Sequence, residues 1–78
     1  MQIELTRTAQ KGLKKMPAKD RAALLAKLKL FAETKQGDVK KLQGADAYRL
    51  RHGNYRAIFE IENNILVIRV AHRKEVYD

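Results

Sequence analysis

The sequence from Ala47 to His72 reads AYRLRHGNYRAIFEIENNILVIRVAH and contains three blocks of alternating residues. We expect a strand in each block, at Ala47–His52, Tyr55–Glu62 and Ile65–His72, because successive strand side chains point to opposite faces. The breaks between them, Gly53-Asn54 and Asn63-Asn64, consist of residues that tolerate positive φ, as two-residue hairpin turns require. The stretch therefore predicts a three-stranded antiparallel meander.

Tight turns would also fix which residues lie side by side in this meander. Leu50 is then expected opposite Ala57, and Ala57 opposite Val70. The next row would hold Tyr48, Phe59 and Ile68. Together with Leu66, these residues form the predicted core face, which the rest of the chain must cover.

The opposite face of the predicted meander is rich in arginine. Its two rows are Arg51, Arg56, Ala71 and Arg49, Ile58, Arg69, and Arg73 continues the same parity. Like charges directly opposite each other, as expected for Arg51 and Arg56, destabilise a sheet by about 0.2–1 kcal/mol, although Glu60 on this face is expected to neutralise part of the charge. Arginine offers a planar fork that grips phosphate oxygens. We interpret this as a phosphate-binding face, the alternative being a solvated outer face.

The N-terminal half changes to helical periodicity. We expect a strand at Gln2–Leu5, a helix from Thr6 or Thr8 to about Met16, a second helix at Ala18–Thr34 that Gly37 ends, and a linker at Asp38–Asp46. Pro17 suits the start of the second helix. The prediction is an α+β fold, in which a strand and a two-helix hairpin pack on a small antiparallel sheet.

Composition narrows the class of function. The chain has 78 residues, enough for one domain (1–78), and its 17 Lys and Arg against 9 acidic residues give a net charge of +8. Such an excess favours a polyanionic partner, above all nucleic acid. The chain has no cysteine, which fits the reducing cytoplasm. Neither a signal peptide, a membrane span nor a metal-ligand cluster is expected from the sequence.

The last seven residues, from His72 to Asp78, carry further candidate groups. His72, Arg73 and Tyr77 are suited to proton transfer, charge stabilisation and base stacking, respectively. His72 is the one side chain nearby that titrates close to neutral pH, so an acid or base role is a hypothesis. Its parity places it on the core face at a strand end, where a structural role is the alternative, and Tyr77 has the alternative of packing against the domain.

The ordered set of motifs after Lys40 resembles the RelE-type toxins. These motifs are Lys41-Leu42 with Gly44, Tyr48-Arg49-Leu50-Arg51, Gly53-x-Tyr55-Arg56, and His72-Arg73-x-x-Val76-Tyr77. The resemblance extends over essentially the whole chain and implies a β-α-α-β-β-β fold. It also implies a cytoplasmic mRNA interferase that cuts mRNA on the ribosome without metal or cofactor and that a cognate antitoxin binds in a heteromeric complex.

The resemblance further implies roles for single residues. Arg56 would stabilise the phosphate in the transition state, Arg73 would assist the leaving oxygen, and Tyr77 would stack on a nucleotide. Arg49 and Arg51 stand where ribosome-dependent members often carry lysines, but an arginine is almost never deprotonated and makes a poor general base. Lys40, Lys41 and Arg69 are further candidate RNA contacts. No helix is expected after Tyr77, because the sequence given stops at Asp78.

Two other functions remain open from the sequence. ParE-type toxins resemble this chain but bind DNA gyrase, and they generally lack the arginine-to-tyrosine ending. A non-catalytic RNA-binding module is the other alternative, because no good general base is evident.

Overall fold

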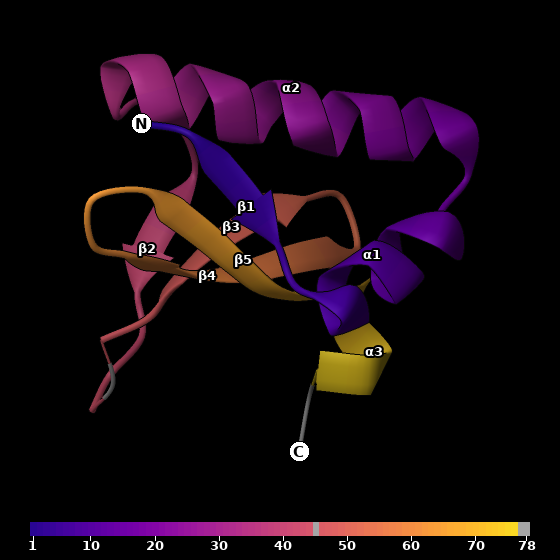
Figure 1. The fold of residues 1–78 in the computed structure, drawn as a ribbon. Helices are drawn as coiled ribbons and strands as arrows, with labels where there is room; N and C mark the ends of the chain where they lie inside the picture. The colour runs from indigo at the N-terminus through magenta and orange to yellow at the C-terminus, as the bar shows by residue number, and fades with distance from the viewer. Residues whose placement is uncertain (45, 77–78) are drawn as a thin grey trace.

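Five strands form a single mixed sheet at the centre of the molecule (Figure 1). The computed structural model describes residues 1–44 and 46–76. The strands are β1 (Ile3–Leu5), β2 (Val39–Lys41), β3 (Tyr48–His52), β4 (Tyr55–Ile61) and β5 (Ile65–His72). Their order across the sheet is β1-β5-β4-β3-β2, with β1 parallel to β5 and the other pairs antiparallel. The predicted α+β fold and its meander are confirmed.

Two helices connect β1 to the rest of the sheet. They are α1 (Arg7–Lys14) and α2 (Ala18–Thr34), and a four-residue helix, α3 (Arg73–Val76), follows β5. Of the two predicted caps, Thr6 is the one that begins α1, because its side-chain oxygen accepts a hydrogen bond from the Ala9 N–H at 3.1 Å. The same hydroxyl donates to the Ile68 carbonyl at 2.6 Å, so the start of α1 is fixed to β5.

The end of α2 differs from the prediction. Lys35, and not Gly37, takes the left-handed conformation that closes the helix, with φ 59°. Its N–H donates to the Phe31 carbonyl at 2.8 Å and satisfies one of the last free carbonyls. A non-glycine residue therefore adopts, at the end of α2, a conformation that glycine normally provides.

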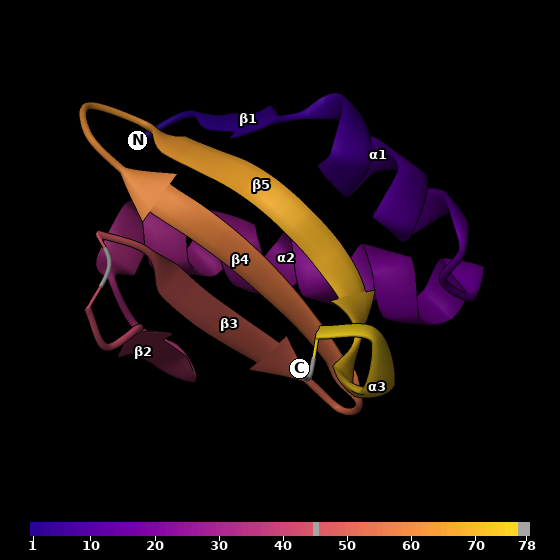
Figure 2. The same cartoon turned by 90° about the horizontal axis from the view of Figure 1, so that it is seen from below.

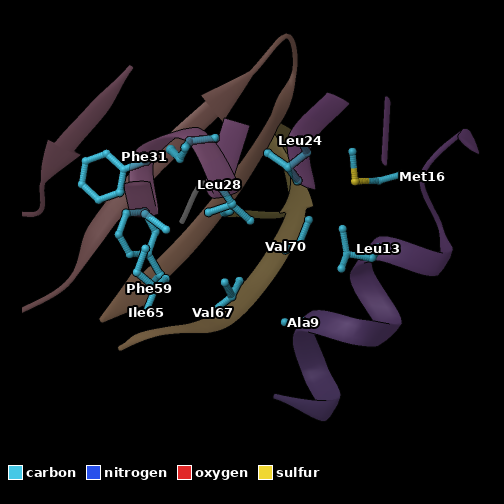
Figure 3. Packing of buried hydrophobic residues seen from close by; sticks show 13 residues of the cluster. Ala9, Leu13, Met16, Leu24, Leu28, Phe31, Phe59, Ile65, Val67 and Val70 are labelled. Atoms are coloured by element: carbon cyan, nitrogen blue, oxygen red, sulfur yellow. The ribbon is translucent and has the colours of Figure 1, made fainter. Parts of the chain in front are cut away.

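The hydrophobic core lies between α2, α1 and one face of the sheet (Figure 3). Phe59 is fully buried and contacts two aromatic rings, Phe31 edge-on at 5.6 Å and Tyr48 in a stacked arrangement at 5.7 Å between ring centres. Leu50 and Ala57, predicted as neighbours on the core face, are both buried and paired. The opposite face of the sheet is left uncovered by α1 and α2 (Figures 1 and 2).

A β-bulge changes the predicted pairing of β5. Ala57 pairs with Val70 and Ile58 with Arg69, as expected, but Phe59 pairs with Val67 and not with Ile68. The extra residue on β5 reverses the two faces beyond the bulge. Val67, which has the same parity as the outer-face residues Arg69 and Ala71, is therefore fully buried, while Leu66, predicted in the core, is 36% exposed.

The segment expected to be a linker contains strand β2. Val39 pairs with Leu50, Lys40 with Arg49, and Lys41 with Tyr48. Its residues, Val39, Lys40 and Lys41, do not alternate between apolar and polar, which is why the sequence pattern did not predict the strand.

Candidate functional site

Five arginines lie on β3, β4, β5 and the start of α3, and we call the surface that they define the arginine face. They are Arg49, Arg51, Arg56, Arg69 and Arg73. The sheet register confirms both predicted rows: Arg51 is opposite Arg56, and Ile58 lies between Arg49 and Arg69. Both rows lie before the bulge, which changes the pairing of β4 with β5 only after Ile58. This is the face of the sheet that α2 does not cover (Figure 2).

Three of these arginines converge on one hollow, which we call the three-arginine pocket. Arg51, Arg56 and Arg73 line it together with Gly53, and its volume is about 150 Å³. Arg51 comes from β3, Arg56 from β4 and Arg73 from α3. Arginine binds oxyanions through parallel N–H donors, so three guanidinium groups around one hollow are chemically suited to a phosphate-sized anion.

Arg73 reaches this pocket by a route that the sequence pattern did not predict. It was expected at the end of a strand, but it is the first residue of α3. Its backbone N–H donates to the Asn54 carbonyl at 2.6 Å, which attaches α3 to the turn between β3 and β4. Gly53 in that turn has φ 54°, as the predicted tight hairpin requires.

Arg49 lies next to the pocket-lining residues and is partly buried. Its Nε atom is buried and has no hydrogen-bond partner among the described residues. A buried donor without a partner costs about 1–3 kcal/mol. A bound anion on this face would supply the missing acceptor.

The two candidate lysines of the predicted linker lie on different sides of the sheet. Lys40 is opposite Arg49 in the register and therefore shares its face, which extends that row of the arginine face to β2. Lys41 is opposite Tyr48 and shares the other face. The structure thus brings Lys40, but not Lys41, to the arginine face.

His72 lies apart from the three-arginine pocket. It pairs with Tyr55 across the sheet, and the two rings meet edge to face at 5.3 Å between centres. The imidazole lines a separate cavity between α1 and β5, in agreement with its predicted core-face parity. Tyr77, the other candidate in the tail, lies outside the described residues.

Acidic side chains gather at the other end of the uncovered face. Glu60 lines a hollow there with Glu4 and Glu62. The sheet therefore carries cationic side chains where β3 turns into β4 and carboxylates where β4 turns into β5. A polyanion on this face would be attracted to the first end and repelled from the second.

A contact that the sequence reasoning missed positions the turn beside the three-arginine pocket. Asp20, near the start of α2, accepts a hydrogen bond from the His52 ring through Nε2, at 3.1 Å. His52 is the last residue of β3 and directly precedes Gly53. The two partners are 32 positions apart, so no local pattern could have indicated the contact.

Residues 1–44 and 46–76 contain no group of three or more His, Cys, Asp or Glu side chains placed to hold a metal ion. None of the helices described has both the length and the apolar character needed to cross a bilayer.

Comparison with known proteins adds an independent result. Residues 3–77 match the family model described as ParE toxin of type II toxin-antitoxin system, parDE. The chain is 34% identical over 89 residues to Toxin RelE3 of Methanocaldococcus jannaschii, covering 100% of this chain and 97% of that protein.

Solved structures give the same result for the fold. The RelB-RelE antitoxin-toxin complex of Methanococcus jannaschii contains a chain with a TM-score of 0.81 and 30% identity, with 96% of this chain and 95% of that chain covered. A chain of the intact E. coli RelBE toxin-antitoxin complex has a TM-score of 0.74 and 26% identity, with 90% and 93% covered.

Proposed function

We propose that this chain is an endoribonuclease that cuts mRNA at its arginine face. The chain belongs to the RelE-type toxins of type II toxin–antitoxin systems. The observation that supports this most directly is the convergence of Arg51, Arg56 and Arg73 on one pocket. Those three residues come from three different elements, so the cluster depends on the fold and not on a local run of charge.

The proposed reaction is attack of a ribose 2′-oxygen on the neighbouring phosphorus. A bond from the 2′-oxygen to phosphorus forms while the bond from phosphorus to the 5′-oxygen breaks. The 2′-hydroxyl loses its proton, the leaving 5′-oxygen gains one, and the products are a 2′,3′-cyclic phosphate and a 5′-hydroxyl. Negative charge accumulates on the phosphate oxygens in the transition state, and fixed cationic donors stabilise it.

Arg56 is the residue to which we assign that charge stabilisation. It is partly buried at the centre of the sheet, between Arg51 on β3 and Ala71 on β5. Arg73 is assigned to the leaving oxygen, and Tyr77 to stacking on a nucleotide. Arg49 and Arg51 would hold the RNA strand in position by its phosphates.

The placement of His72 disfavours the acid or base role predicted for it. It lines a different cavity from the three-arginine pocket. Its Nδ1 atom also accepts a hydrogen bond from the Lys74 N–H at 3.2 Å. In the neutral ring the proton is then on Nε2, which makes that nitrogen a donor and not a base.

A cognate antitoxin is the proposed protein partner, in a heteromeric complex in the cytoplasm. Relatives from two organisms were solved as complexes of RelE with RelB. An acidic antitoxin segment would complement the net charge of +8. The mRNA substrate would be cut on the ribosome.

The first prediction concerns cleavage in cells. Induction of the chain should create new mRNA 5′ ends that can be ligated only after phosphorylation, because the proposed reaction leaves 5′-hydroxyls. Arg56→Ala should lower the yield of these ends by about 10²–10³-fold, as expected for loss of one transition-state donor. Arg7→Ala removes an exposed arginine of α1 that lines neither cavity and is the matched control. Full cleavage by a folded Arg56→Ala protein would show that the assigned site is wrong.

One finding favours a second candidate function, inhibition of DNA gyrase. The description of the family model that matches residues 3–77 names the ParE toxin. The same cells distinguish the two functions, because DNA damage with intact mRNA after induction would support gyrase inhibition and contradict the nuclease.

A further inference from the structure

A second, larger cavity lies between α1 and the C-terminal half of β5, with a volume of about 400 Å³. We call it the α1–β5 cavity. It is lined by Thr8, Lys11, Gly12, Lys15, Tyr55, Arg69, Val70, Ala71 and His72. Pairing between β1 and β5 ends at Leu5 and Val67, so the rest of β5 has α1 and not a strand beside it on that side (Figure 2). Its volume lies within the range of about 300–1,000 Å³ typical of ligand pockets.

The glycine of α1 accounts for how closely the helix approaches the strand. A Cβ atom at Gly12 would collide with the Val70 carbonyl. The helix backbone therefore packs directly on the backbone of β5, which places Lys11 and Lys15 at the cavity. Lys11 belongs to α1, and Lys15, four positions later, caps the C-terminal end of that helix in a helical conformation.

Lys11, Lys15 and Arg69 give the lining of the cavity a positive charge. Lys11 and Lys15 are exposed, and neither forms an ion pair within residues 1–44 and 46–76. The Nδ1 atom of His72 accepts from the Lys74 backbone, so in the neutral ring the proton is on Nε2. None of the lining residues is a carboxylate. This chemistry selects an anion.

Arg69 connects the cavity to the arginine face. It lines the cavity, and in the sheet it stands in the row of Arg49 and Ile58. A chain of phosphates on the arginine face could therefore continue past Arg69 toward Lys11 and Lys15. The connection through Arg69 therefore favours a strand of phosphates over an isolated anion or an acidic protein segment, because neither of these needs to reach both surfaces.

We infer that the α1–β5 cavity binds a backbone phosphate of the RNA strand that the arginine face holds, with Lys11 and Lys15 as its cations. The inference rests on the proposed function and adds a second anchor for the same substrate. Lys11 and Lys15 bind and position RNA, and they take no part in bond breaking.

The second prediction tests this anchor with the full chain and a labelled single-stranded RNA whose 2′-hydroxyls are all methylated, so that it cannot be cut. The double variant Lys11→Gln/Lys15→Gln should bind with a log–log salt slope less steep by about 0.7, because it loses one phosphate contact and each such contact on a single strand contributes about 0.7. Lys14→Gln/Lys27→Gln removes the same charge from exposed positions outside the cavity, and it should keep the wild-type slope.

The outcomes separate this inference from the proposed function. If wild-type protein binds RNA through Arg56 but the Lys11→Gln/Lys15→Gln variant has an unchanged slope, the cavity is not an RNA site and only this inference fails. If the variant binds RNA as the wild type does but binds the antitoxin more weakly, the cavity binds protein and the inference is also overturned. If wild-type protein does not bind RNA at all, the proposed function fails as well.

Discussion

Arg51 and Arg56 stand directly opposite each other in the sheet, and that arrangement carries a cost for folding. Two like charges at paired positions destabilise a sheet by about 0.2–1 kcal/mol. Stability alone therefore does not explain the pair. A phosphate held between them would turn the repulsion into binding, because both guanidinium groups line the same pocket.

The third prediction follows from this conflict between stability and binding. Arg51→Gln should raise the free energy of unfolding by about 0.2–1 kcal/mol, because it removes one of two opposed charges. The same variant should bind RNA more weakly. Urea unfolding measures the first effect, and Lys27→Gln, an exposed substitution on α2, is the control. A loss of stability in Arg51→Gln would contradict a repulsive pair.

Among the helices and strands, the end of α2 contains a residue in a costly backbone conformation. Lys35 has φ 59°, which side chains with a Cβ atom adopt at a cost of about 1–2 kcal/mol. The fourth prediction is that Lys35→Gly stabilises the fold by about 1 kcal/mol and raises the Tm by about 4–8 °C.

The neighbouring position supplies the control for that substitution. Gln36 does not have positive φ, so Gln36→Gly should not stabilise the fold and should add only the entropic cost of glycine. Thermal unfolding of both variants is the measurement. Equal effects of the two substitutions would show that the conformation of Lys35 carries no strain.

The strands show which parts of the fold can be predicted from sequence. The two-residue turns fixed the register from Leu50 to Val70, and with it the rows of the arginine face. The bulge at Ile68 could not be predicted, because an apolar residue inside an apolar strand gives no sign that it is unpaired. Strand β2 was missed because two consecutive lysines follow Val39 and break the alternation.

The candidate site, like the fold, was predictable where it depends on strand register and not where it depends on distant contacts. Alternation placed Arg49, Arg51, Arg56 and Arg69 on one face, and the register confirms it. The position of Arg73 on α3 and the hydrogen bond between Asp20 and His52 both depend on contacts between distant segments. No local sequence pattern indicates such contacts. The sequence pattern did not single out Lys11 and Lys15, and only the cavity beside β5 suggests a role for them.

In the molecule as a whole, one face of the sheet packs against helices and the other face carries the charged side chains. Helices α1 and α2 cover the face that carries Phe59 and Leu50, and the uncovered face carries the arginines (Figures 1 and 3). Opposite charges lie at the two ends of that face, since Glu4, Glu60 and Glu62 surround a hollow away from the three-arginine pocket. This polarity would favour one placement of an RNA strand over others.

The fifth prediction tests the central claim, that the arginine face binds RNA through its phosphates. The measurement is the affinity of wild-type protein for an uncleavable single-stranded RNA over a range of salt concentrations. One phosphate in the three-arginine pocket and one each at Arg49 and Arg69 predict a log–log slope of about −2.1, and the α1–β5 cavity would make it steeper. Arg56→Ala should flatten the slope by about 0.7. An affinity that does not change with salt would contradict phosphate binding by this face.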